Sequence, residues 1–200
     1  MKNLQVALVL LAAGESRRMG TPKQLLTYKG FSLVRHATTE AIKSNCEPIV
    51  VVLGAKSDRI RGEINDLPVH ITDNPRWQQG MSASIATGIA TLLEMKIDFS
   101  AVVVALADQP LITDRVYNCL IESYYQNQVK AVACNYSDTI GVPALFDCIL
   151  VPELLNISDR GGAKQILYRY SDRAHNLDLP EAAIDIDTPA DYQKLLNFRR

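Results

Sequence analysis

The chain alternates short, valine-rich apolar runs with amphipathic segments, and this alternation restricts its possible folds more than any other feature. The runs are residues 4–12, 48–53, 101–107 and 131–134. Runs of this length and composition are typical of strands buried on both faces of a sheet. The segments between them carry apolar residues at helical spacing. Such alternation predicts a largely parallel sheet with helices on both faces.

The remaining elements follow from local signals. Helices are expected at 31–45, at 82–95 with Ser82 as the N-cap, at 115–127, and from Asp187 onward, where a capping residue precedes Pro189. The last third of the chain is less regular. Short strands are expected there at 143–146, 174–178 and 182–186, some of them antiparallel at an edge of the sheet. We find no repeat and no linker, which predicts a single domain over residues 1–200.

Composition excludes several classes of protein. The net charge of -1, from 21 basic and 22 acidic residues, gives no general attraction to nucleic acid or to an anionic membrane. No apolar run reaches the ~18–20 residues that cross a bilayer, and the first run lacks a signal-peptide cleavage pattern. The four cysteines form no Cys-x-x-Cys pair. We expect them to be buried apolar residues of a cytoplasmic protein rather than disulfides or zinc ligands.

The segment after the first apolar run combines small residues with cations; it reads LAAGESRRMGTPK over 11–23. Small residues let a base and phosphates approach the backbone N–H groups, and here they are Ala12, Ala13 and Gly14, after Leu11. The cations, which suit a polyphosphate, are Arg17, Arg18 and Lys23. The alternative is an ordinary surface turn with solvated arginines.

Two common phosphate-binding motifs do not fit this segment. It is not Gly-x-x-x-x-Gly-Lys-Ser/Thr, because Lys23 follows Gly20 by three residues and no hydroxyl residue comes next. It is not Gly-x-Gly-x-x-Gly, because Gly14 has no glycine two residues later. The second exclusion argues against a nicotinamide cofactor.

Asp108 directly follows the third apolar run and begins an Asp-Gln-Pro sequence. Ligands of open α/β sheets bind beyond the carboxyl ends of the strands, which places Asp108 near the loop after the first run. Mg²⁺ takes one or two carboxylates together with phosphate oxygens and water. Asp108 is therefore a candidate Mg²⁺ ligand. The alternative is a turn residue, because Asp-x-Pro is common in turns.

Two further segments add candidates. The expected helix N-terminus at Gly80, Met81 and Ser82 offers free N–H groups and a positive dipole end to a phosphate, although many helices begin this way without a ligand.

Asp185 and Asp187 lie on the same side of an extended segment. Either can complete the Mg²⁺ shell. We favour Asp187, and the alternative is that it only caps the last helix.

The motif LAAGxSxRMG, followed by Lys23, resembles the signature loop of cytidylyltransferase-type nucleotidyltransferases, and especially the molybdenum cofactor cytidylyltransferase family. Later segments match the same family in order: NPRWQQGMSASI at 74–85, DQP at 108–110, GVPALF at 141–146 and DIDTPADY at 185–192. Two residues depart from the family pattern. Val142 stands where many relatives have histidine, and Ser158 replaces a glycine, both on the acceptor side.

The resemblance implies a three-layer α/β/α Rossmann-like nucleotidyltransferase fold, mostly parallel with an antiparallel strand. It implies Mg²⁺-dependent transfer of CMP from CTP to the terminal phosphate of molybdopterin, with release of pyrophosphate. Arg18 and Lys23 would offset the β- and γ-phosphates, while Asp108 and Asp187 hold Mg²⁺. The nucleotide would be bound by Leu11, Ala12, Ala13, Gly14, Gly80, Met81 and Ser82. A molybdoenzyme or its maturation chaperone would receive the product.

CTP is favoured over GTP, because guanylyltransferase relatives carry two glycines where this chain has AAG at 12–14, and the methyl groups leave less room. Three alternatives stay open. The sequence PKQ at 22–24 also matches methylerythritol-phosphate cytidylyltransferases, although these have a different segment after the central strand. The second alternative is a sugar-phosphate nucleotidyltransferase. The third is a non-catalytic chaperone that carries the molybdenum cofactor, which the intact Arg18, Lys23 and Asp108 argue against.

Overall fold

The computed structural model describes residues 5–136, 139–158 and 161–197. The strands are β1 (Gln5–Ala12), β2 (Thr27–Tyr28), β3 (Phe31–Ser32), β4 (Cys46–Leu53), β5 (His70–Asp73), β6 (Phe99–Leu106), β7 (Ala131–Tyr136), β8 (Thr139–Asp147) and β9 (Ala174–Asp178). The α-helices are α1 (Leu33–Lys43), α2 (Ser57–Arg61), α3 (Met81–Glu94), α4 (Asp114–Asn127), α5 (Val151–Leu155), α6 (Gly162–Arg169) and α7 (Pro189–Asn197).

Within these residues seven strands form one mixed sheet, in the order β5-β4-β1-β6-β8-β7-β9. Only β8 runs antiparallel to its neighbours β6 and β7. The predicted parallel sheet with one antiparallel strand is therefore confirmed. The expectation that antiparallel pairing would occur at an edge is wrong, because β8 lies inside the sheet. Its residues 141–146 are all buried, so an interior position removes the most apolar surface from water.

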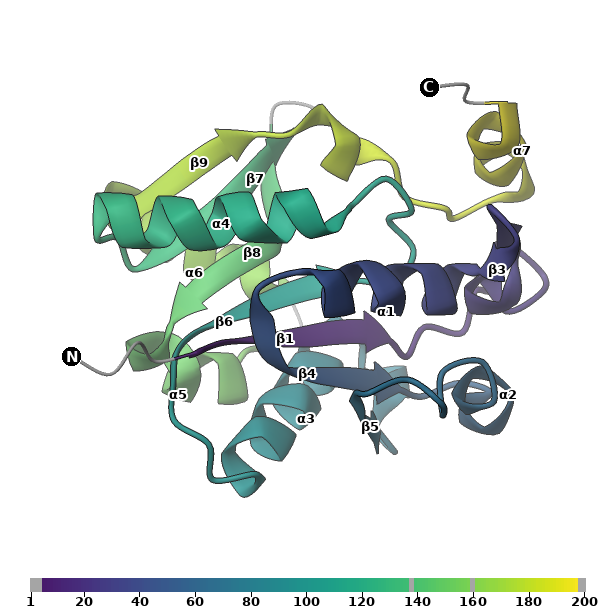
Figure 1. The fold of residues 1–200 in the computed structure, drawn as a ribbon, viewed down its shortest axis with the longest axis horizontal. Helices are drawn as coiled ribbons and strands as arrows, with labels where there is room; N and C mark the ends of the chain where they lie inside the picture. Colours follow the sequence, from purple (N-terminus) through teal and green to yellow (C-terminus); the bar gives the residue numbers. More distant parts are fainter. Residues whose placement is uncertain (1–4, 137–138, 159–160, 198–200) are drawn as a thin grey trace.

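Helices cover both faces of the sheet (Figure 1). Successive residues of β1 point to opposite sides: Leu8 and Leu10 join the core under α1 and α4, while Val9 joins the core under α3, α5 and α6. Gly88 brings α3 onto β1, since a Cβ at this residue would lie 2.3 Å from Val9 Cγ1. This close packing fixes where the N-terminus of α3 meets the carboxyl end of β1.

The C-terminal segment, defined as residues 184–197, does not follow the prediction for 182–186. No strand forms there: Pro180–Ala183 is a 3₁₀ helix, followed by irregular chain before α7. The backbone bonds to the loop after β6 instead, because the Ala182 carbonyl accepts from Gln109 Nε2 (2.9 Å) and the Ile186 N–H donates to the Asp108 carbonyl (3.0 Å). The helix predicted after Asp187 is present as α7.

A small third core attaches this segment to the N-terminal half. It contains Met19, Tyr28, Leu33, Leu111, Ile186 and Leu195. We call this group the satellite core. The Tyr192 hydroxyl adds a hydrogen bond of 2.7 Å to the Thr27 carbonyl, and Figure 1 shows α7 beside β3. The end of the chain is thereby held near the carboxyl ends of β1 and β6.

Two smaller expectations need correction. Ser82 is not the N-cap of α3: the helix begins at Met81 after Gly80, and the Ser82 hydroxyl donates to the Ser158 carbonyl at 2.9 Å. None of the four cysteines forms a disulfide, but only Cys46 and Cys134 are buried, while Cys119 and Cys148 are exposed. Cys119 lies off the buried face of α4 and Cys148 lies in a surface turn. No helix among the described residues is long and apolar enough to span a membrane.

Candidate active site

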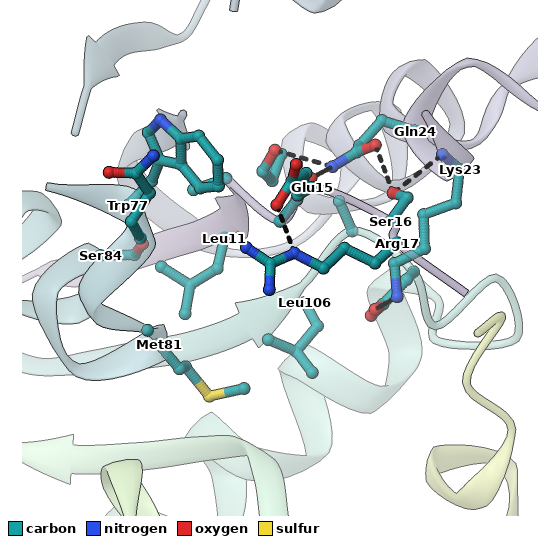
Figure 2. A pocket seen from close by; sticks show the side chains of 17 residues that line it. Leu11, Glu15, Ser16, Arg17, Lys23, Gln24, Trp77, Met81, Ser84 and Leu106 are labelled. Atoms are coloured by element: carbon teal, nitrogen blue, oxygen red, sulfur yellow. Dashed lines mark hydrogen bonds and ion pairs between the residues drawn. The ribbon is translucent and has the colours of Figure 1, made fainter. Parts of the chain in front are cut away.

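A cavity of about 400 Å³ opens beyond the carboxyl ends of β1 and β6 (Figure 2). Its walls come from the loop after β1, the 3₁₀ helix Trp77–Gln79, the first turn of α3 and the end of β6. Most of the predicted site residues line it: Leu11, Ala12, Ala13, Gly14, Lys23, Gly80, Met81 and Asp108. Three predicted residues are not part of its lining: Arg18, Ser82 and Asp187.

A single buried amide holds the loop after β1. Gln24 is 3% exposed, and its Nε2 donates to the carbonyls of Ala12 (3.1 Å) and Gly14 (2.7 Å). Its Oε1 accepts from the Ser16 hydroxyl (3.2 Å), whose oxygen in turn accepts from the Lys23 N–H (3.1 Å). This network fixes both ends of the loop, so its small residues keep their place at the cavity wall.

Gly14 lines the cavity, but it is not one of the residues of this loop with a left-handed backbone. The left-handed positions of the loop are Ser16, with φ of 62°, and Gly20, with φ of 73°. A Cβ built on Gly14 would meet no atom within 4 Å. We conclude that the turn itself depends on residues further along the loop.

Lys23 joins two carboxylates from distant parts of the chain. Its ammonium forms an ion pair with Asp108 Oδ2 and lies 2.8 Å from Asp187 Oδ1. Arg18 Nη2 lies 2.6 Å from Asp187 Oδ2. The loop after β1, the loop after β6 and the C-terminal segment therefore meet at one point. Lys23 and Asp108 share the cavity, as the sequence predicts, while Arg18 reaches the cluster through Asp187.

The surroundings keep Lys23 and Asp187 charged at neutral pH. Burial lowers the pKa of Lys23, but Asp108 and Asp187 outweigh that effect, so the pKa lies above its ordinary value. Burial raises the pKa of Asp187, but Lys23 and Arg18 bring it below its ordinary value. Asp185 differs, because burial and then the charge of Asp108 raise its pKa to about 6.

The carboxylates fit a hard divalent cation that is shared with a ligand. Asp108 Oδ1 and Asp185 Oδ1 are buried without a hydrogen-bond partner. Unpartnered carboxylate oxygens are the ligands that Mg²⁺ and Mn²⁺ prefer. No group of three or more His, Cys, Asp or Glu side chains in the described part of the chain is arranged to hold a metal ion. The protein therefore offers one or two carboxylates, and phosphate oxygens would supply the rest.

The N-terminus of α3 faces the same cavity. Gly80 precedes the helix with φ of 101°, a conformation that favours glycine, and no described side chain caps the first turn. Its N–H groups are therefore available to an anion. Met81 lines the cavity and is 45% exposed. Trp77 both lines the cavity and packs against Gly54, where a Cβ would lie 2.6 Å from Trp77 Cβ.

Several residues of the cavity wall were not among the predicted catalytic, nucleotide-binding or metal-binding residues. Arg17, rather than Arg18, lines it; its side chain is 79% exposed and its Nε lies 2.6 Å from Glu15 Oε2. Gln24 and Ser84 also line it, and the Ser84 hydroxyl accepts from Asn74 Nδ2 at 3.0 Å. Arg17 stands beside the predicted arginine, so spacing gave no basis for choosing between them. Gln24 and Ser84 carry no charge, and although the matching segments 22–24 and 74–85 contain them, neither was assigned a role.

The acceptor side offers no base at residue 142. Val142 is buried in the core under α3, α5 and α6, and its carbonyl accepts from Gln109 Nε2 (3.3 Å) and the Tyr136 hydroxyl (3.2 Å). The two residues after Ser158 lie outside the described residues, which resume at Gly161. Lys164, within α6, is not among the residues that line the cavity.

The family model described as "MobA-like NTP transferase domain" matches residues 8–174. The chain belongs to this family. It is a nucleotidyltransferase of the MobA-like type, with the fold of such enzymes. Residues 185–197, including Asp185 and Asp187, lie beyond the matched region.

Proteins with different names are similar in sequence to this chain. It is 29% identical over 197 residues to nicotine blue oxidoreductase of Paenarthrobacter nicotinovorans, covering 94% of this chain and 95% of that one. It is 28% identical over 206 residues to a probable molybdenum cofactor guanylyltransferase of Carboxydothermus hydrogenoformans, covering 99% and 98%. It is also 30% identical over 141 residues to the bifunctional protein GlmU of Coxiella burnetii, but spans only 30% of that protein's length.

Solved structures confirm the fold: a nucleotidyl transferase from Methanothermobacter thermautotroptrophicus aligns with a TM-score of 0.78 at 18% identity, over 96% of each chain. Rv0371c of Mycobacterium tuberculosis aligns with a TM-score of 0.83 at 24% identity, over 98% of this chain and 100% of that one. A complex of Rv0371c with manganese aligns with a TM-score of 0.73 at 21% identity over the same shares. At these identities the likeness establishes the fold alone.

Proposed function

We propose that the protein transfers CMP from CTP to the terminal phosphate of a molybdopterin-type acceptor and releases pyrophosphate. The observation that carries the proposal is the meeting of Lys23 and Asp108 at one end of the cavity below the glycine-containing loop. A triphosphate needs cations on its oxygens and a carboxylate that shares a divalent ion with it. The chain of 1–200 would act as one nucleotidyltransferase domain.

In this reaction an oxygen of the acceptor phosphate attacks the α-phosphorus, and the bond from that phosphorus to the pyrophosphate oxygen breaks. The acceptor phosphate is already anionic near neutral pH, so no covalent enzyme intermediate and no general base is needed. Catalysis then depends on alignment and charge neutralisation. Lys23 would offset the charge that develops on the leaving pyrophosphate. Arg17, at the cavity mouth, and Arg18, beside Asp187, would add to it.

The first turn of α3 would hold part of the triphosphate through its N–H groups, at Met81 and Ser82. The nucleoside would lie along Leu11, Ala13 and Gly14, where the loop leaves open space. Asp108 would hold Mg²⁺, with Asp187 as the second carboxylate. When bound, Mg²⁺ neutralises phosphate charge and orients the triphosphate. A related structure is described as a manganese complex, which supports a divalent ion without deciding its identity.

CTP is proposed over GTP because Ala12 and Ala13 stand where guanylyltransferases carry glycine. Ala13 lines the cavity, so its methyl group takes up room beside the nucleoside. The test is pyrophosphate release with CTP, GTP, ATP and UTP, in the presence of Mg²⁺ and a molybdopterin acceptor. A response to GTP alone would overturn the choice of nucleotide. A panel of sugar and polyol phosphates in the same assay tests the other acceptors.

A second candidate function comes from the full-length similarity to a protein named nicotine blue oxidoreductase. It predicts a redox reaction instead of pyrophosphate release, and reduced nicotinamide is the electron donor that we would test. The absence of Gly-x-Gly-x-x-Gly after β1 weighs against it. The chaperone alternative predicts molybdopterin binding without turnover of any nucleotide. Absorbance at 340 nm and pyrophosphate release, measured on the same preparation, separate these outcomes; a recipient molybdoenzyme is tested by transfer of the labelled product.

A further inference from the structure

Lys23 lies in the position that the proposed function assigns to the divalent cation. Its ammonium contacts Asp108 Oδ2 and lies 2.8 Å from Asp187 Oδ1, so it bridges the two carboxylates. The side chain is only 12% exposed, which places the charge in the cluster rather than in solvent. A metal ion and this ammonium cannot both bridge these oxygens, because two cations at contact distance repel strongly.

We propose that Lys23 is the resting occupant of the cation site: it positions Asp108 and Asp187, and it leaves only when a triphosphate enters. This inference rests on the proposed function and adds an order of binding to it. The divalent cation enters together with the nucleotide, and the protein alone has little affinity for the metal.

The geometry allows this exchange without movement of the backbone. Lys23 also lines the cavity, and its N–H is held by the Ser16 hydroxyl oxygen at 3.1 Å. The four-carbon stem can therefore rotate its ammonium from the carboxylates to a phosphate in the cavity. Asp187 keeps its pair with Arg18, at 2.6 Å, after Lys23 has left. Asp108 then has two free oxygens, since its Oδ1 is already without a partner.

The test measures Mn²⁺ binding without nucleotide, by the relaxation of water protons around the protein-bound ion. We expect Lys23→Met to bind Mn²⁺ at least about tenfold more tightly than the wild type, because it removes a positive charge from the site. Lys56→Met is the matched control: Lys56 is exposed at the N-terminus of α2, and its loss should leave Mn²⁺ affinity unchanged. Adding Asp108→Asn to Lys23→Met should abolish the gained affinity.

A second arm uses the wild-type protein and does not depend on the folding of a variant. Mn²⁺ is titrated with and without CTP, and the relaxation signal distinguishes protein-bound ion from Mn²⁺ bound to free CTP. We expect tight binding only with CTP. Equal affinity in the two titrations would overturn the proposal, as would a folded Lys23→Met protein that binds Mn²⁺ no better than the wild type.

The experiments distinguish a failure of the proposed function from a failure of this inference. Pyrophosphate release from the wild type tests the reaction, whereas the titration of Lys23→Met uses neither nucleotide nor turnover. Release of pyrophosphate from CTP, combined with unchanged Mn²⁺ affinity in Lys23→Met, would overturn this inference and leave the reaction standing. Tighter Mn²⁺ binding in Lys23→Met without any pyrophosphate release would support the inference and remove the reaction.

Discussion

Asp108 and Asp187 meet the same ammonium, but different parts of the molecule hold them. Asp108 follows β6, a central strand that pairs with β1 and β8 and is fully buried over Ala101–Ala105. Asp187 lies in irregular chain that is attached by the satellite core and a few hydrogen bonds. One carboxylate of the site is therefore held by the central sheet. The other depends on the satellite core and lies beyond the region that the family model matches.

The largest expected effect tests the two carboxylates as a pair. Asp108→Asn should lower kcat for pyrophosphate release by ~10²–10³ or more, because the amide loses the charge that holds the divalent ion. Asp187→Asn should cost less, because Asp108 remains. Both changes keep side-chain size, so the fold should be retained, and urea unfolding measures the stability lost with the ion pair to Lys23. Equal losses in the two variants would show that the peripheral carboxylate matters as much as the one on the sheet.

The attachment of the C-terminal segment can be weakened on its own. Ile186 is fully buried in the satellite core, so Ile186→Ala should cost about 2–4 kcal/mol by leaving a cavity. We expect amide hydrogen exchange to rise within residues 184–197 while β1 and β6 stay protected. Activity should fall with the loss of Asp187 from the cluster.

Ile89→Ala, in the core between α3 and the sheet, is the matched control for that change. It removes the same group from a fully buried position, so it should lower the free energy of unfolding of the whole protein. Uniform loss of protection in Ile186→Ala would show that the C-terminal segment is no separate unit and would remove the distinction between it and the sheet.

The same two parts of the molecule differ in how well the sequence predicts them. The apolar runs fix β1, β4, β6 and β7, because a strand buried on both faces must be apolar throughout. Their carboxyl ends then bring Lys23 and Asp108 together, which the sequence predicts correctly. The strand predicted at 182–186 is absent. The alternating pattern of this segment suits a strand, but its backbone groups bond to Gln109 and Asp108 instead. Tertiary contacts of that kind leave no local pattern.

The sequence also could not predict the roles of side chains that depend on tertiary contacts. Gln24 holds two carbonyls of the loop only because the fold buries it, and an uncharged residue after a lysine gives no signal. Which of Arg17 and Arg18 lines the cavity depends on the turn at Ser16, where the backbone is left-handed. Motif spacing locates the loop, while the direction of each side chain follows from its backbone angles.

A smaller effect is expected from the loop clamp on the sheet side. Gln24→Leu leaves the carbonyls of Ala12 and Gly14 without donors, which should cost about 1–3 kcal/mol of unfolding free energy. The loop should then lose its fixed shape, raising KM for the nucleotide more than it lowers kcat. Gln126→Leu, at an exposed residue of α4 outside the cavity wall, is the matched control and should change neither quantity. An unchanged KM in Gln24→Leu would separate the clamp from nucleotide binding.

The smallest expected effect is a pH dependence at the junction of the two parts. His36 Nε2 donates to the Pro110 carbonyl at 3.0 Å, two residues after Asp108, and its ring packs edge-on against Tyr28 of the satellite core. Burial is the main cause that holds the pKa of His36 below its ordinary value. The unfolded chain therefore takes up a proton at higher pH than the folded one. His36 thus makes stability fall as the pH drops below about 6.5.

His36→Gln isolates this contribution, because its side-chain amide can still donate to Pro110 but does not titrate. Urea unfolding at pH 7.5 and 5.5 should show that the wild type loses more stability than His36→Gln between the two values. Because other groups titrate equally in both proteins, the difference between them reports His36 alone. The same slope in both proteins would mean that His36 is protonated as readily when folded as when unfolded. The contact between His36 and Pro110 would then be open to water. The loop that carries Asp108 would be less firmly held than the strands of the sheet.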